Sequence, residues 1–200
     1  NMSEEEIMEI LATRGAQAEG IWFTIPEGYT IKKIAETLEN NKIVTQDEFM
    51  EALKETKYDY DFLSEIPERS NRLEGYLFPD TYEVREGADA AEIVSKMLNR
   101  FDEIVKPEYY MRAQELGYTM DEIIIIASII EQEAKLEEER PRVAGVIYNR
   151  LESDIPLQMC STVMYALGKR KDRLLYKDLE VDSPYNTYLH GGLPVGPICN

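Results

Sequence analysis

Two glutamates near the middle of the chain, Glu131 and Glu133, have the type and spacing that could supply acid–base chemistry. They close the segment Asp121–Ala134, which contains six isoleucines. On a helical wheel Glu131 lies between Ile124 and Ala127. A carboxyl group among apolar side chains resists ionisation, so its pKa rises. Such a group can stay protonated near neutral pH and act as a general acid.

Spacing alone does not decide between the two glutamates. Glu133 also falls between apolar positions, Ile126 and Ile129. The acidic run Glu137–Glu139 follows closely, so the helix could simply be emerging into solvent, and spacing alone favours that simpler interpretation.

The helix that must position these carboxylates has a clear beginning. Thr119 followed by Glu122 has the pattern of a capping box. The isoleucines then fall on nearly every side of the wheel, which is typical of a helix in the middle of a domain. The sequence therefore predicts a buried central helix with acidic residues in its last turn.

Three further segments combine polar and aromatic residues with glycine and proline. They contain Glu74, Gln158 and the neighbours Tyr185 and Asn186. Such side chains in a cleft can stack on sugar rings and bind hydroxyl and acetamide groups. The alternative is that the tyrosines are core residues and the asparagines are turn residues.

Composition narrows the classes of partner and cofactor. The formal net charge of −17 argues against nucleic acid and against an anionic membrane surface as partners. One histidine, His190, and two cysteines, Cys160 and Cys199, predict neither a metal site nor another cofactor. No run of 18 apolar residues and no signal peptide is visible.

The remaining pattern predicts an α+β fold. Residues 21–25 are strand-like, residues 57–71 look like a connection, and residues 73–84 suggest short strands around a turn. Thr30 can cap one helix, and Thr45 with Glu48 forms another capping box. Helices are also expected at residues 3–14, 90–105, 107–117 and 141–151, and beyond residue 154 the pattern weakens into short segments.

Several motifs together resemble the YceG-like family over roughly residues 20–200. They are Leu73–Tyr82, Ala127–Ala134, Val146–Leu151 with Pro156–Gln158, and Ser183–Tyr188 with Gly192–Pro197. They occur in the family's order, which is more specific than any single motif.

The resemblance implies a small LysM-like α/β subdomain followed by a mixed α/β catalytic domain built round the buried central helix. The expected division is an N-terminal helical segment at 1–20, the LysM-like subdomain and its connection at 21–71, and the catalytic domain at 72–200. Because the family usually continues past the last motif, the catalytic domain is expected to be truncated at its C-terminus.

The activity that the resemblance implies is that of a lytic transglycosylase of peptidoglycan. It would cleave the β-1,4 bond between N-acetylmuramic acid and N-acetylglucosamine, form 1,6-anhydro ends and so limit glycan strand length. Peptidoglycan strands would be the substrate, cell-wall synthases are suggested as protein partners, and the site would be extracytoplasmic. An N-terminal membrane anchor is expected in the full-length protein.

The family's catalytic glutamate maps onto Glu131, which makes Glu133 a supporting residue. Glu74, Gln158, Tyr185 and Asn186 are expected to hold the substrate. Where the family usually has a small polar residue and often Asp after Leu-Gln, this chain has Met159 and Cys160. Two alternatives remain: a non-catalytic peptidoglycan-binding module, and an interaction protein with acidic surfaces.

Overall fold

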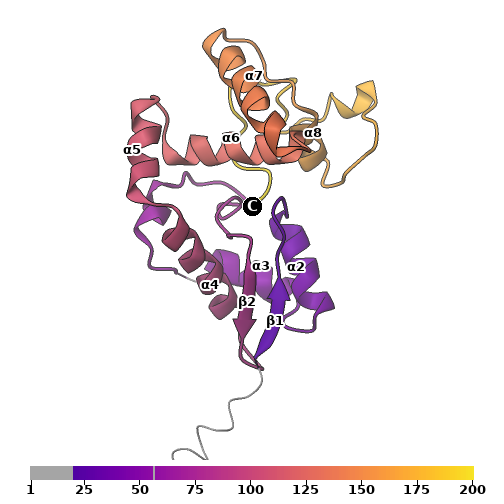
Figure 1. The fold of residues 1–200 in the computed structure, drawn as a ribbon. Helices are drawn as coiled ribbons and strands as arrows, with labels where there is room; N and C mark the ends of the chain where they lie inside the picture. Colours follow the sequence, from indigo (N-terminus) through magenta and orange to yellow (C-terminus); the bar gives the residue numbers. More distant parts are fainter. Residues whose placement is uncertain (1–19, 56) are drawn as a thin grey trace, which may run out of the picture.

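A computed structural model describes residues 20–55 and 57–200 of the chain. Figure 1 shows a lower part with the two strands and an upper part with the later helices. Helix α6 (Met120–Glu133) lies between the two parts. The helix predicted at residues 3–14, and with it the N-terminal segment 1–20 apart from Gly20, lies outside the described residues.

The lower part is built on an antiparallel pair of strands. β1 (Ile21–Thr24) pairs with β2 (Thr81–Val84), with Ile21 opposite Val84. Alternate residues point to opposite faces of the pair, so Phe23 and Tyr82 pack inward at 5.6 Å between ring centroids. The sequence predicted the first strand correctly. It did not predict that its partner lies 60 residues later.

Two capped helices follow β1. α2 (Ile31–Asn40) begins after Thr30, whose hydroxyl accepts a hydrogen bond from the Lys33 amide. α3 (Gln46–Glu55) begins after Thr45, which exchanges hydrogen bonds with Glu48. Both predicted caps are confirmed. They fix the register that turns the apolar faces of these helices into the core.

The predicted irregular connection at 57–71 is more ordered than expected. It contains a short 3-10 helix, η1 (Asp61–Glu65), and buries Phe62, Leu63 and Ile66. The ring of Phe62 stacks at 5.9 Å on that of Tyr76. This segment is therefore part of the core, and its polar sequence hid the three buried side chains.

α4 and α5 lead from the lower part to the upper part (Figure 1). α4 (Ala90–Ile104) begins at Asp89, whose carboxylate accepts a hydrogen bond from the Glu92 amide. α5 (Pro107–Glu115) has proline in its first turn. Proline lacks an amide hydrogen, and the first turn of a helix leaves that donor unpaired anyway.

The isoleucine helix α6 (Met120–Glu133) starts with the predicted capping box at Thr119. It is shared between two hydrophobic cores. Ile124 packs into the lower core, whereas Ile125, Ile126 and Ile129 belong to the upper core. The helix thus forms a wall common to both parts of the molecule.

The upper part completes the fold with α7 (Arg140–Glu152) and α8 (Cys160–Ala166). α7 follows a 3-10 turn, η2 (Glu137–Glu139), and has Pro141 in its first turn, as predicted. α8 was missed by the sequence analysis. The last segments are irregular apart from η3 (Tyr176–Asp178).

The architecture is α+β, as the sequence predicted. The LysM-like character of the lower part and the division at residue 71 remain predictions, and the second strand comes from beyond that division. Within the described residues, no helix is long and apolar enough to span a membrane.

Candidate active site

Glu131 lies on the one open side of α6. Ala127, one helical turn earlier on the same side, is exposed although its isoleucine neighbours are buried. The Glu131 side chain is 31% exposed, and its Oε2 lies 2.9 Å from Nη2 of Arg140 at the start of α7. The apolar enclosure expected around this carboxyl group is therefore replaced by an open face and an ion pair.

The turn between β1 and α2 rests against this acid. Gly28 has φ +75°, a conformation that favours glycine, and a Cβ added there would lie 3.7 Å from Cγ of Glu131. Gln132 Nε2 donates to the Gly28 carbonyl at 2.9 Å. Gly28 in turn donates its amide to the carbonyl of Asn200 at 2.7 Å. The lower part is thus fixed directly beside Glu131.

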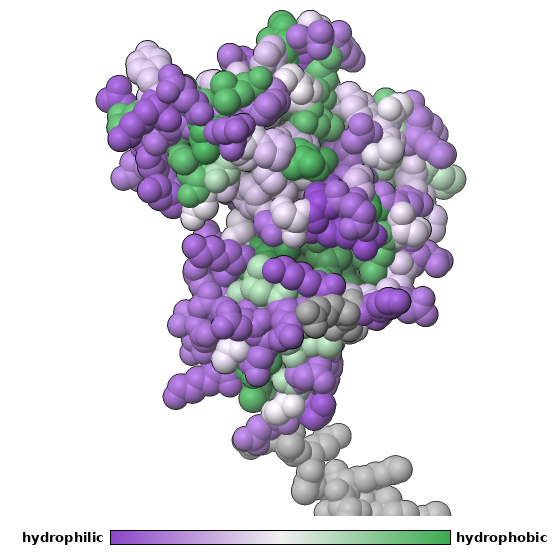
Figure 2. Space-filling view, turned by 180° about the vertical axis from the view of Figure 1, so that it is seen from behind, coloured by the Kyte–Doolittle hydropathy of each residue, from purple (hydrophilic) through white to green (hydrophobic). Residues whose placement is uncertain are grey.

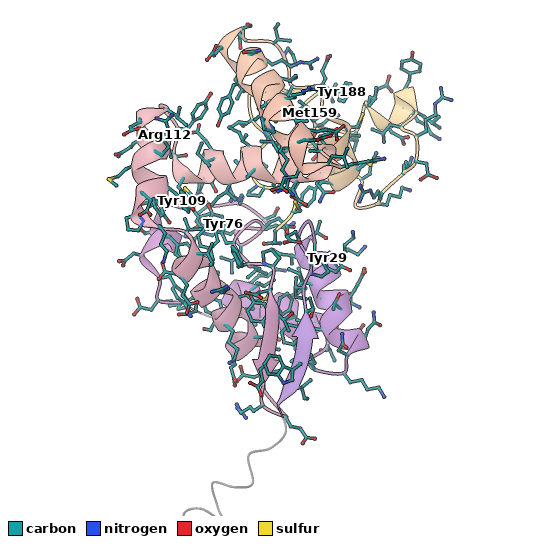
Figure 3. The ribbon with its side chains drawn as sticks, viewed as in Figure 1. Tyr29, Tyr76, Tyr109, Arg112, Met159 and Tyr188 are labelled. Atoms are coloured by element: carbon teal, nitrogen blue, oxygen red, sulfur yellow. The ribbon has the colours of Figure 1, made fainter. Side chains whose placement is uncertain are left out.

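The neighbouring Tyr29 marks the same junction. In Figure 3 it stands at the upper end of the lower part, beneath the region of α8 that carries Met159. The Lys33 ammonium lies over its ring, 5.2 Å from the centroid. The residue after Gly28 is thus an aromatic side chain with a cation over its ring.

Glu133 is engaged elsewhere. Its Oε1 accepts a hydrogen bond from the Ser161 amide at 3.0 Å, in the first turn of α8. An acceptor at this place satisfies an amide that the helix leaves unpaired. This contact fits the supporting role expected for Glu133, because it holds α8 against the end of α6.

Glu74 is buried, with only 1% of its surface exposed. Its carboxylate accepts hydrogen bonds from the Ile31 amide, the Tyr165 hydroxyl and the Asn200 side-chain amide at 2.9, 2.9 and 2.6 Å. Burial raises the pKa of Glu74 to about 7, although the three donors oppose that shift. These buried contacts favour a positioning role for Glu74, and the substrate-holding role expected for it stays a prediction.

Tyr185 and Asn186 are also buried. Asn186 donates to the carbonyls of Leu179 and Val181, both at 2.9 Å, and accepts the Tyr188 amide at 3.0 Å. These bonds engage both hydrogens of the side-chain amide and its oxygen, so Asn186 shapes the loop. The substrate-binding role expected for Asn186 stays a prediction.

Tyr185 packs its ring against Tyr165, with 4.7 Å between centroids. Its hydroxyl is buried and has no hydrogen-bond partner among the described residues. Like Asn186, it lies beneath the surface rather than on it.

Gln158 is the exposed member of the predicted holding set. Its backbone has φ +51°, and its amide donates to the Thr187 carbonyl at 3.0 Å. Met159 donates its own amide to the Thr187 hydroxyl at 3.0 Å. The backbone is pinned while the Gln158 side chain stays free to meet a ligand.

Sequence reasoning missed two residues beside the site, Arg140 and Asn200, and an ion pair at the other end of α6. Arg69 makes a bidentate ion pair with Asp121 in the first turn of α6, at 2.7 and 2.8 Å. The Tyr76 hydroxyl also donates to Asp121 at 2.7 Å. The partners are 45 and 52 residues apart, so no local pattern could have revealed them.

Other features of the described residues bear on cofactors. They contain no group of three or more His, Cys, Asp or Glu side chains that could hold a metal ion. Both cysteines are free thiols, Cys160 exposed and Cys199 buried. Two cavities of about 600 and 620 Å³ lie in the lower part, and Glu131 lines neither of them.

Fold and site together define an α+β protein with a partly exposed glutamate, Glu131, paired with Arg140 in the helix shared by two cores. The sequence model of the YceG-like family matches residues 1–200. The chain therefore belongs to the YceG-like family.

One solved structure and two curated proteins are similar to this chain. The crystal structure of a yceG-like protein from Listeria monocytogenes superimposes with a TM-score of 0.80 at 32% identity, covering 100% of this chain and 69% of that one. The endolytic murein transglycosylase of Bacillus subtilis is 35% identical over 199 residues, which is 94% of this chain and 55% of the relative. That of Streptococcus pneumoniae strain D39 is 33% identical over 227 residues, covering 99% of this chain and 40% of the relative. The chain thus spans about half the length of these relatives.

Proposed function

We propose that this chain forms the catalytic part of an endolytic murein transglycosylase. It would cut the bond between N-acetylmuramic acid and N-acetylglucosamine within peptidoglycan strands and leave 1,6-anhydro ends. The observation that carries the proposal is the position of Glu131 on the open face of α6, in a chain of the YceG-like family. Two relatives with this activity in their names support it.

One acid is enough for this reaction. Protonated Glu131 donates its proton to the glycosidic oxygen, the C1–O bond breaks, and an oxocarbenium-like centre forms. The Glu131 carboxylate then takes the proton from the C6 hydroxyl of the same sugar as that oxygen attacks C1. The ring closes without consuming water, and an intramolecular attack can have an effective concentration of about 10⁵ M or more.

The surroundings of Glu131 favour this route over two-carboxylate hydrolysis. Glycosidases generally need a second carboxylate about 5–10 Å from the acid. Of the other two predicted glutamates, Glu133 is engaged by the Ser161 amide and Glu74 is buried beneath the surface. Glu131 is partly exposed, and its carboxylate pairs with the Arg140 side chain, which it must release to meet a sugar oxygen.

The same proposal sets the place of action. Peptidoglycan strands lie outside the cell membrane, so the protein would work at the extracytoplasmic face, held there by an N-terminal anchor. Cell-wall synthases, which make the strands, are the protein partners that this placement suggests.

The test uses uncrosslinked peptidoglycan strands and mass spectrometry of the products. The protein containing this chain should release anhydro-muramyl ends, and Glu131→Gln should abolish them. Glu138→Gln, an exposed acid in the run after α6, is the matched control and should keep the activity. Equal product from the parent and Glu131→Gln would refute the role of Glu131. Strand binding without any anhydro product from the parent would favour the binding-module alternative.

A further inference from the structure

One loop reverses the charge of this acidic protein. Between residues 169 and 177 there are five basic side chains and a single acidic one, Asp172, whereas the whole chain carries −17. We call this segment the basic loop. Its cationic residues are Lys169, Arg170, Lys171, Arg173 and Lys177.

The basic loop has a fixed conformation. The buried carboxylate of Asp178 pairs with Lys171 at 2.6 Å and accepts the Leu175 amide at 2.8 Å. Asn186 holds the following backbone through the carbonyls of Leu179 and Val181. The loop is thus pre-organised, which lowers the entropy lost when a ligand binds.

Despite these internal bonds, the tip points into solvent. Tyr176 is 89% exposed and Leu175 is 51% exposed. Figure 1 shows the segment after α8 standing out from the upper part, and in Figure 2 the corresponding lobe at the upper left is mostly hydrophilic. Two neighbouring apolar side chains are therefore held outside any core.

Four of the five basic side chains are exposed and make no ion pair within the described residues. Lys169, Arg170, Arg173 and Lys177 are exposed. None of them makes an ion pair with another residue in 20–55 or 57–200. At physiological ionic strength the Debye length is about 8 Å, so an approaching anion senses this local positive charge more than the distant acidic surface.

The chain links the basic loop to the acid through α8. Glu133, two residues after Glu131, binds the first turn of α8 at Ser161. α8 has seven residues, about 10 Å at 1.5 Å per residue, and the loop follows it. A strand that extends from Glu131 along α8 would present its side branches to the basic loop.

We infer that the basic loop binds the carboxylates of the stem peptides carried by the same peptidoglycan strand. This inference rests on the proposed function. Stem peptides combine free carboxylates with alanine methyl groups, and the loop offers cations beside Leu175 and Tyr176. An anionic bilayer fits less well, because two apolar side chains do not make the broad apolar face of an interfacial element.

The experiment compares two forms of one strand preparation: untreated, and with the stem-peptide carboxylates converted to amides. Affinity is measured in the Glu131→Gln background so that strands are not cut. The preference of this protein for untreated strands should be about tenfold, and Arg173→Gln with Lys177→Gln should reduce it to about one. The matched control, Lys96→Gln with Lys106→Gln, removes two exposed lysines elsewhere and should keep the preference.

Three results would overturn the inference: no preference in the Glu131→Gln parent, equal loss of preference in the control, or a preference that survives in the loop variant. Phosphatidylglycerol vesicles provide a separate arm. Vesicle binding that depends on the loop, without a strand preference, would assign the loop to the membrane instead. The proposed function is judged independently, by anhydro ends that the wild-type protein forms on the amidated strands.

Discussion

The side-chain amide of Asn200 donates to the buried carboxylate of Glu74 at 2.6 Å, across 126 residues of sequence. The Asn200 side-chain oxygen also accepts the amides of Gly75 and Leu77 at 2.8 and 2.9 Å. Its backbone amide donates to the Tyr29 carbonyl at 2.8 Å. This one residue thus joins the segment around Glu74 to the turn beside Glu131.

Replacing Asn200 should therefore destabilise the junction. Asn200→Ala leaves the Glu74 carboxylate and two backbone amides short of partners, and we expect a loss of about 2–4 kcal/mol in the free energy of unfolding. Urea denaturation followed by circular dichroism measures it. A loss below about 0.5 kcal/mol would show that the network around Asn200 does not hold the fold.

The raised pKa of Glu74 predicts a pH-dependent stability. Its pKa of about 7 in the folded state lies above the ordinary value of 4.5, so between these values the folded state binds more protons than the unfolded state. The contribution is fully present below about pH 4.5 and is lost as pH rises through 7. In full it is about 3 kcal/mol, and the part between pH 5 and pH 8 is about 2–3 kcal/mol.

The control for this effect is Glu74→Gln, which keeps the shape and cannot ionise. We expect the stability difference, Gln variant minus parent, to be more favourable to the variant at pH 8 than at pH 5 by that same amount. Identical pH profiles for the two proteins would contradict the assignment to Glu74.

Gly28 and Gly87 form a matched pair of glycines. Both have positive φ, +75° and +74°. A Cβ added at Gly28 would lie 3.0 Å from Gln132 Nε2, whereas a Cβ added at Gly87 would have no atom of the described residues within 4 Å. Gly28→Ala and Gly87→Ala should each cost about 1–2 kcal/mol for the left-handed backbone. Only Gly28→Ala should also lower the rate of anhydro-end formation, because it displaces the turn beside Glu131. Equal rates in the two variants would separate that turn from the site.

Removing one partner of the Arg69–Asp121 ion pair should destabilise the fold more than replacing both partners. Its side chains are 2% and 8% exposed, and breaking a buried pair from one side leaves an uncompensated charge. We expect Asp121→Ala to cost about 3–5 kcal/mol, and Arg69→Met with Asp121→Leu to cost clearly less. Thermal unfolding of the single and double variants checks this. A double variant as unstable as the single one would mean that the ion pair itself is needed.

Local patterns predicted much of the secondary structure. Thr30, Thr45 and Thr119 each begin a helix as expected, because a cap depends on residues only three positions apart. α8 was not predicted because it is short and the residue before it, Met159, gives no capping side chain. Its cap comes instead from Glu133, 28 residues earlier.

The site was harder to predict than the helices. Family resemblance selected Glu131, but the apolar surroundings inferred from the wheel were wrong on one side, where Ala127 is exposed. Glu74 and Asn186 looked like ligand-binding residues because a polar side chain in a glycine-rich segment has the same appearance whether it faces a substrate or a buried backbone. The contacts of Glu74 lie at least 43 residues away, and those of Asn186, although within seven residues, join backbone groups that no side-chain pattern reveals.

The division of α6 between two cores has a consequence for the timing of activity. Ile124 needs the lower core and Ile129 needs the upper one, so the helix gains its full packing only when both have formed. A partly folded chain would therefore lack a correctly held Glu131. If the chain cuts peptidoglycan as proposed, this shared packing confines a correctly held Glu131 to chains in which both cores have formed.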